Sequence, residues 1–285
     1  MTKIERNERL TRLALLVVAF SAVSVLAIIT IFIFSEGLPI MFKYGFKAFL
    51  VGRDWYPTEK SFGLLPMIIG SMMVTAGALA LAVPFGLACA VFLAEFSSKR
   101  ARTIVKPVIE LLAGIPSVVY GFIGMVILVP LIRERLGGPG LSVLAASIIL
   151  GIMVLPTIIS ISIDSFLAVP KTYREGSIAM GATRWQSVRM VVFPAARSGV
   201  IASIILGMGR AVGETMAVIM IAGNSIDIPR SILSPVRTLT SNIALEMGYA
   251  SGEHRQALFA TGVILFVIIM ILNTVANLTS SRRRG

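Results

Sequence analysis

The stretch that decides the fold runs from Ala168 to Pro194 and reads AVPKTYREGSIAMGATRWQSVRMVVFP. In it, Thr172 is followed three residues later by Glu175. This spacing predicts a capping box, in which the threonine accepts a bond from the third amide of a helix and the glutamate reaches back to the cap's own N–H. Gly181 follows where a left-handed residue would end that helix. The sequence therefore predicts a short helix closed by a tight glycine turn.

A second short helix is predicted directly after this turn. Thr183 and Gln186 repeat the capping-box spacing, and Pro194 cannot continue a helix comfortably. Two helices of about 8–10 residues are marginal alone, so they must be held by something else. Three cations are expected to keep the unit in water: Arg174, Arg184 and Arg189. The residues leave two interpretations open: the unit packs on its own membrane domain, or it docks a cytoplasmic partner through its apolar side chains, Ile178, Met180, Ala182 and Trp185.

The rest of the chain is too apolar for a soluble domain. Of its 285 residues 56% are hydrophobic and 14% are charged, whereas soluble domains carry about 25% charged residues. Each of six charge-poor stretches exceeds the ~20 residues that cross about 30 Å of hydrocarbon. They are 13–34, 62–94, 107–132, 141–166, 198–223 and 258–278. We predict an all-α membrane protein with six transmembrane helices, the first being a retained anchor because it is longer than a signal-peptide core.

The net charge of +12 indicates how the chain is oriented. Sixteen Lys and Arg lie in 62 residues on the side of the N-terminus, loop 95–106, loop 167–197 and the C-terminal tail, against nine in 69 residues on the other side. Cytoplasmic loops carry the excess of Lys and Arg, so both termini and loop 167–197 are expected in the cytoplasm. The basic charge is thus a topology signal, and nothing in it requires nucleic acid.

Three regions follow from this pattern. Residues 1–61 form an N-terminal transmembrane helix and an outer loop, 62–279 a permease-like membrane domain, and 280–285 a basic cytoplasmic tail. Outer loop 35–61 carries aromatic residues among its charges, which is typical of a segment lying near the lipid headgroups. These aromatic residues are Phe42, Tyr44, Phe46, Phe49, Trp55 and Tyr56.

A charged pair is predicted in the middle of the fifth span. Arg210 is central in 198–223, and Glu214 follows four residues later, which places both on one helix face. A charge at the bilayer centre costs about 2.5–3.5 kcal/mol. Gly209 and Gly213 would let another helix approach closely. The pair could lock helices together, or it could line a polar path in which the arginine offers a planar fork to an oxyanion.

The other reactive side chains give no sign of enzymatic chemistry. Glu110 and Asp164 lie near the cytoplasmic ends of their spans and are expected to reach water. Cys89 and His254 are the single cysteine and histidine, which excludes a Cys/His metal site. The chain has no G-x-x-x-x-G-K-[S/T] phosphate loop. We therefore predict no catalytic residue and no metal ligand.

Loop 167–197 resembles a known family in its residues and spacing. The run Glu175-Gly176-Ser177-x-x-x-Gly181, nine further residues and then Val191-x-Phe193-Pro194 is similar to the signature of permease subunits of type I ABC importers, the MetI-like fold. Gly176 and Ser177 stand where the family often has alanines, and Phe193 stands where it usually has leucine. The resemblance implies that this loop is the coupling helix that docks a separate ATPase. It implies docking roles for Glu175, Gly176, Ser177, Gly181 and Pro194, and a structural role for Glu175.

A second run narrows the resemblance to phosphate importers. Residues 209–218, GRAVGETMAV, resemble the fifth-span motif of their permeases, and the ending resembles the PstC type more than the PstA type. Trp55-x-Pro57 followed by FGLLP at 62–66 agrees. The resemblance implies a non-catalytic subunit that moves inorganic phosphate by alternating access, with Arg210 and Glu214 at or near its path. The residues alone leave open another oxyanion, such as molybdate, sulfate or phosphonate, and a gradient-driven carrier.

The same resemblance implies an assembly in a bacterial or archaeal cytoplasmic membrane. It would join this chain to a PstA-like permease, to a PstB-like ATPase dimer inside and to a PstS-like phosphate-binding protein outside. The chain itself would bind membrane lipid but no cofactor, because the partner ATPase would use the ATP and Mg²⁺.

Overall fold

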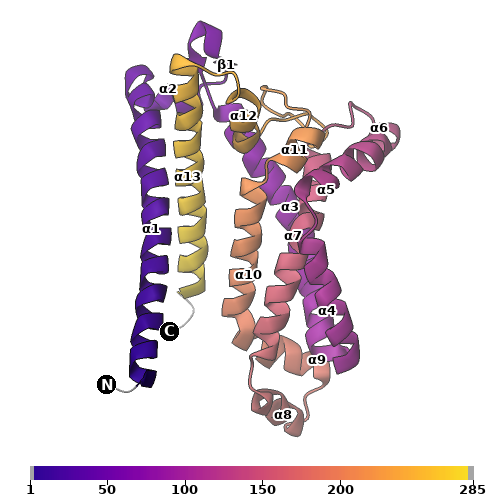
Figure 1. The fold of residues 1–285 in the computed structure, drawn as a ribbon. Coiled ribbons are helices and arrows are strands. Elements are labelled where there is room, and N and C mark those ends of the chain that lie inside the picture. Colours follow the sequence, from indigo (N-terminus) through magenta and orange to yellow (C-terminus); the bar gives the residue numbers. More distant parts are fainter. Residues whose placement is uncertain (1–2, 282–285) are drawn as a thin grey trace.

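The computed structural model describes residues 3–281, with side chains for Glu8 and for residues 11–275. Within this part, six helical segments are long and apolar enough to cross a membrane: Thr11–Tyr44, Leu65–Phe96, Ser117–Leu136, Val143–Leu167, Arg184–Gly213 and Gly252–Val275. The predicted all-α class and the six spans are confirmed (Figure 1). Residues 282–285 of the predicted basic tail lie outside the described residues.

The first and last spans pair with each other beside the remaining helices (Figure 1). Helix α1 is Lys3–Tyr44 and α13 is Gly252–Ser281. The prediction that the first span ends near residue 34 is wrong, because α1 continues to Tyr44. Its last turn is held by α13: Lys43 forms an ion pair with Glu253, and the Tyr44 hydroxyl donates to Glu253 Oε2 at 2.8 Å.

The outer loops fold into a cap on the helices. The cap holds α2 (Phe46–Val51), the antiparallel strands β1 (Trp55–Tyr56) and β2 (Ser61–Phe62) joined by the 3-10 turn Pro57–Glu59, and α12 (Leu239–Glu246).

The aromatic residues of the cap are partly buried. The prediction of an aromatic segment lying at the headgroups is wrong for Phe49 and Trp55, which are 0% and 2% exposed. Trp55 Nε1 donates to Glu246 Oε2 at 2.9 Å, as a buried indole N–H requires a partner. Phe42 does remain exposed.

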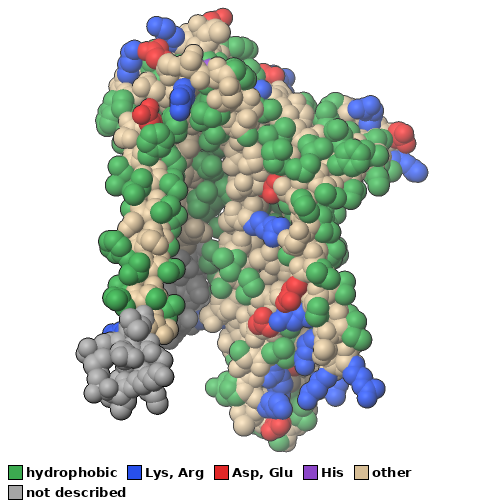
Figure 2. Space-filling view, viewed as in Figure 1, with side chains coloured by type: hydrophobic (Ala, Val, Ile, Leu, Met, Phe, Trp, Pro, Cys, Tyr) green, Lys and Arg blue, Asp and Glu red, His purple; other side chains and the backbone are tan. Residues whose placement is uncertain are grey.

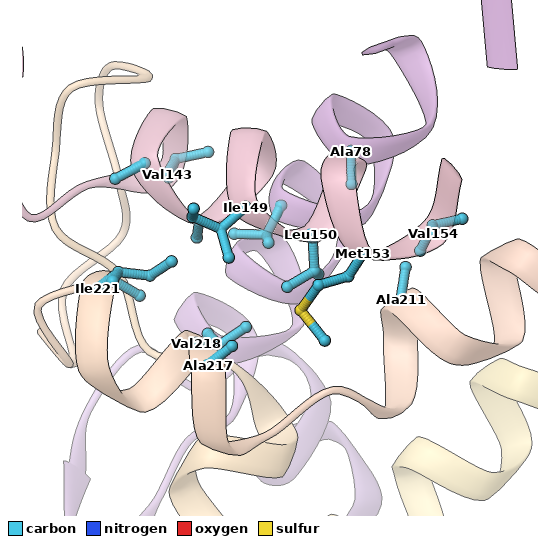
Figure 3. Close-up of a cluster of buried hydrophobic side chains, with 14 of the residues drawn as sticks. Ala78, Val143, Ile149, Leu150, Met153, Val154, Ala211, Ala217, Val218 and Ile221 are labelled. Atoms are coloured by element: carbon cyan, nitrogen blue, oxygen red, sulfur yellow. The ribbon is translucent and has the colours of Figure 1, made fainter. Parts of the chain in front are cut away.

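Helix α7 (Val143–Leu167) forms the centre of the molecule. In its most apolar 18-residue window 61% of the residues are buried, against 28% or less in the other five spans. Helices α3 (Leu65–Val91), α4 (Lys99–Ala113) and α10 (Phe193–Gly213) pack against it. Figure 3 shows how side chains of α3, α7, α10 and α11 (Met216–Ile221) meet in the largest apolar cluster.

A glycine lets α10 lie close to α7. A Cβ at Gly207 would stand 2.7 Å from Val154 Cγ1 and 3.0 Å from Ile158 Cγ1. By contrast, a Cβ at Gly209 or Gly213 would meet no described atom within 4 Å. The prediction that Gly209 and Gly213 admit a neighbouring helix is therefore wrong within this chain, and Gly207 has that role.

The third span, Ser117–Leu136, begins ten residues later than the continuous stretch predicted over 107–132, and α4 lies before it as a separate helix. Helix α4 ends at Ala113, and α5 (Ser117–Ile123) begins after a break at 114–116. Pro116 disfavours helical backbone in the residue before it, which places the break there. The span continues through a π-helical turn, Gly124–Leu128, into α6 (Val129–Leu136).

Candidate functional site

The fifth span ends at the acidic residue predicted to lie within it. Helix α10 stops at Gly213, and Glu214 has extended backbone with φ −68° and ψ 130°. Its carboxylate accepts a bond from the Ala217 amide at 3.2 Å, in the first turn of α11, whose cap residue is Thr215. Its carbonyl accepts from the Thr240 hydroxyl at 3.0 Å. The prediction of Arg210 and Glu214 as a same-face helical pair is wrong because the helix ends between them, and no ion pair within 4.0 Å joins them in the described structure.

Arg210 instead forms a hydrogen bond at the break between α4 and α5. Its Nη2 donates to the carbonyl of Ala113, the last residue of α4, at 3.3 Å. The last carbonyls of a helix have no partner within it, so the arginine stabilises the end of α4 just before the third span begins. The guanidinium is only partly buried, and within residues 3–281 it has no carboxylate within 4.0 Å. Two interrupted helices therefore meet at one arginine.

More charged side chains lie on this face, toward the α8 end. Lys106 forms an ion pair with Asp164 and lies 3.7 Å from Glu110 Oε1. The Ser160 hydroxyl donates to Glu110 Oε1 at 2.9 Å. Figure 2 shows basic and acidic side chains that are sparse at mid-height and gather toward the α8 end of the molecule. Glu110 and Asp164 are more than half exposed, which confirms that they are not buried in protein.

Loop 167–197 contains two short helices, but the first begins differently from the prediction. Helix α8 spans Lys171–Ala179 with Pro170 as its cap, and no side chain caps it. The capping box of Thr172 and Glu175 is therefore wrong, because Thr172 already lies inside the first turn. Gly181 does adopt the predicted left-handed conformation, with φ +89°.

The second helix confirms its predicted start and not its predicted end. In α9 (Arg184–Ser187) Thr183 and Gln186 form both bonds of the capping box. Pro194 does not end this helix, since a π-helical turn, Val188–Val192, joins α9 to α10 without interruption. In that turn the amide of Phe193 donates to the carbonyl five residues back, and Pro194, which has no N–H, follows it.

Arg174, expected only as a solvated cation, is the anchor of the loop. Its guanidinium donates to both carboxylate oxygens of Glu95 at 2.6–3.1 Å, and to the carbonyls of Phe166 and Val169 at 2.6 and 2.7 Å. The Glu95 side chain is 9% exposed and that of Arg174 21%. Glu95 lies in the π-helical turn Phe92–Phe96 that ends the second span. The pair thus fixes α8 to two spans, and sequence spacing could not reveal it because 79 residues separate the partners.

The remaining candidates of the loop divide into an inner and an outer group. Ser177 is 4% exposed and its hydroxyl lies 2.6 Å from that of Ser187, which ties α8 to α9. Glu175 and Gly176 are exposed. Ile178 and Met180 are 51% and 86% exposed, so the loop presents apolar side chains beyond its own anchored base.

Comparison with known proteins places the chain in a family. Residues 82–285 match the binding-protein-dependent transport system inner membrane component family. The chain is 42% identical over 282 residues to "Probable ABC transporter permease protein YqgH" of Bacillus subtilis, covering 96% of this chain and 89% of that protein. It is 36% identical over 259 residues to "Phosphate transport system permease protein PstC" of Pasteurella multocida, covering 84% and 81%.

A solved structure shares the fold. A chain of a bacterial ABC transporter involved in the import of the acidic polysaccharide alginate superposes with a TM-score of 0.66 at 16% identity, over 99% of this chain and 100% of that one. The six spans, the anchored loop and these relatives all indicate a permease of an ABC importer. This chain belongs to the binding-protein-dependent transport system inner membrane components, and within that family to the PstC-type permeases.

Proposed function

We propose that this chain carries inorganic phosphate across the cytoplasmic membrane as one permease subunit of an ATP-driven importer. The observation that carries the proposal is Arg210, a partly exposed guanidinium near the end of α10 that contacts the end of α4. Arginine has five N–H donors, and Arg210 uses one of them on a described residue. The others suit the oxygens of an oxyanion, which arginine binds with bidentate geometry. PstC-type relatives named for phosphate transport support phosphate as the substrate.

The two helix breaks are consistent with a transporter that works by alternating access. Unwound backbone inside a membrane is tolerated where it is buried in protein or lines a water-filled cavity, and discontinuous helices are typical of substrate sites near the midplane. The breaks at 114–116 and at Glu214 would allow the segments on either side to reorient. ATP binding at the partner would favour one orientation over the other by its differential affinity for the two states.

The loop around α8 is proposed as the contact with a PstB-like ATPase dimer. Both termini and this loop would face the cytoplasm, following the excess of Lys and Arg. Glu175, Gly176, Ile178 and Met180 are exposed and available to a groove on the ATPase. Ser177, being buried, would act by holding α8 in shape. The ATPase would bind ATP and Mg²⁺, and this chain would bind no cofactor and catalyse no reaction.

The other partners follow from the same proposal. A PstA-like permease would complete the path, and a PstS-like phosphate-binding protein would deliver phosphate from outside the cytoplasmic membrane of a bacterium or archaeon. The charged side chains on α4 and α7 form an exposed polar face that a second permease could close.

Phosphate uptake by the assembled transporter tests the proposal. In proteoliposomes containing the co-expressed complex and ATP, Arg210→Gln should weaken the apparent affinity for radiolabelled phosphate. A charge-assisted hydrogen bond contributes about 1.5–3 kcal/mol, which corresponds to roughly 10–150-fold in affinity. Arg100→Gln, which removes an exposed cation from the start of α4, is the matched control.

Three results would contradict the proposal. Unchanged affinity in Arg210→Gln would remove this residue from the path. Preferential uptake of sulfate, molybdate or phosphonate would replace phosphate as the substrate. Uptake driven by an ion gradient without ATP would indicate a secondary carrier.

A further inference from the structure

The charged side chains on α4 and α7 form one connected group, here called the inner cluster: Lys106, Glu110, Ser160 and Asp164. Lys106 is paired with Asp164 and lies 3.7 Å from Glu110, which in turn accepts the Ser160 hydroxyl at 2.9 Å. The side chains of Lys106, Glu110 and Asp164 are 25%, 52% and 59% exposed. The cluster thus joins α4 to the fourth span, α7, on a surface that is open in the described chain.

This surface does not suit lipid, and it faces a water-filled cavity or a protein partner. Lys106, Glu110 and Ala113 follow a spacing of four and three residues, so they share one side of α4. The opposite side carries exposed apolar side chains, Ile104, Val108 and Leu111, at 53–74% exposure. Helices with such divided faces place the apolar one against lipid or protein. Charged side chains within spans normally face a water-filled cavity or a protein partner because lipid is costly for them.

The inner cluster continues the polar surface that begins at Arg210. Arg210 binds the carbonyl of Ala113, which stands three residues, or about 4.5 Å along the helix axis, from Glu110. Lys106 lies about 10 Å from Ala113 by the same rise of 1.5 Å per residue. Asp164 lies close to the end of α7, after which α8 follows. One polar strip therefore runs from the two helix breaks to the loop around α8.

The sign of the charge changes along this strip. Arg210 has no carboxylate within 4.0 Å in the part of the chain that the structure describes. Lys106 is shared between two carboxylates, so the cluster carries one net negative charge when its three groups are ionised. An anion is attracted to the first position. At the inner cluster the anion meets Lys106, whose charge is already paired with Asp164 and Glu110. The two carboxylates therefore oppose tight binding of the anion there.

We propose that the inner cluster is the release step of the anion path. Lys106 gives the departing anion a brief contact, and Glu110 and Asp164 prevent a stable complex there, so the anion passes on toward the α8 end. This inference rests on the proposed function and adds a specific set of residues to it. It explains why a lysine that could bind an anion is instead held between two carboxylates.

Opposite charge changes test the release step. Lys106→Gln leaves two uncompensated carboxylates, so the maximal rate of radiolabelled phosphate uptake by the complex in proteoliposomes should fall at least five-fold. Half-saturation by external phosphate should stay within two-fold, because loading precedes release. Lys106→Arg should restore most of the rate. Lys99→Gln removes a cation from the same helix that has no ion pair within the described residues, and it should behave like the wild type.

The double variant Glu110→Gln, Asp164→Asn removes both carboxylates and leaves Lys106 unpaired, so the inner cluster should bind phosphate more tightly. Phosphate enclosed in the vesicles should then inhibit uptake at a concentration at least five-fold lower than in the wild type. A purely structural role of the cluster would lower the rate in both directions without this inhibition. An unchanged inhibition constant overturns the proposal.

Chemical labelling of a cysteine tests whether the polar strip is open to water, and it does not depend on the charge variants assembling into a complex. In a Cys89→Ala background, Ser160→Cys should react from the α8 side with a membrane-impermeant, negatively charged thiosulfonate, and inorganic phosphate should slow the reaction. An unreactive Cys at this position overturns the water-filled strip. Wild-type complex that moves no phosphate overturns the proposed function. Normal wild-type uptake with Lys106→Gln equal to Lys99→Gln overturns the release step alone.

Discussion

Glu95→Gln should release the loop around α8 from the membrane domain. The wild-type carboxylate is 9% exposed and holds a guanidinium that also binds two carbonyls at the end of α7 and just beyond it. Removing one partner of a buried ion pair costs about 3–5 kcal/mol. The Arg174 side chain is 21% exposed and keeps its two carbonyl contacts in the variant, so we expect a smaller cost than this, about 2–3 kcal/mol.

Amide hydrogen exchange measures this loss directly. Local opening of a segment has its own free energy, and about 1.4 kcal/mol changes an equilibrium tenfold. Amides of residues 171–181 in the assembled complex should therefore exchange roughly 30–150-fold faster in Glu95→Gln. Amides in the middle of α7 should not change, since they lie away from the pair.

A double-mutant cycle separates the ion pair from simple loss of packing. Arg174→Met combined with Glu95→Gln leaves no uncompensated charge, so the double variant should exchange less than the two single effects together predict. ATP hydrolysis by the complex should continue while phosphate uptake falls, because α8 would no longer transmit ATPase movement to α7. Exchange within two-fold of wild type in Glu95→Gln, or additive single effects, would refute the reasoning.

Three further changes test the loop, the helix packing and the outer cap. Glu175→Lys, on the exposed side of α8, should leave thermal stability within about 0.5 kcal/mol but reduce co-purification of the ATPase; normal co-purification would count against docking there. Gly207→Ala forces a Cβ to 2.7 Å from Val154 and should cost about 1–3 kcal/mol, measured as a lower melting temperature, whereas Gly209→Ala, with open space around it, should not destabilise; equal effects would contradict the packing. Glu246→Gln weakens the contact with Arg237 at 2.6 Å and should lower the melting temperature of the complex, and an unchanged value would show that the buried cap network contributes little.

The outer cap shows how buried polar groups hold distant segments together. Glu246 is bonded to Trp55, Arg237 and His254, which come from the strand β1, from the segment before α12 and from α13. A buried carboxylate requires such partners, since burying an unpaired charge is costly. The network therefore fixes how the first 61 residues sit on the other spans, which no local pattern in them indicates.

Sequence patterns predicted the features that depend on a few neighbouring residues. Apolar length alone predicted six spans, because crossing hydrocarbon requires about 20 apolar residues. The second capping box and the left-handed Gly181 were also predictable, since a cap and a positive φ depend on a few neighbouring residues. Patterns failed at Thr172, where a helix start was placed too late, and at Pro194, where a π-helical turn carries the helix past a proline.

By itself, the sequence determined the class of the protein and the number of its spans, because hydropathy acts over one element, but it placed Arg210 at the middle of a span that ends three residues after it. The tertiary structure alone decided what those charges do. Arg210 and Glu214 are four residues apart and yet serve different helix ends, while Arg174 and Glu95 are 79 residues apart and form one ion pair. The physical reason is that a buried charge binds whatever partner the packing of distant helices brings to it, and spacing along the chain does not record that partner.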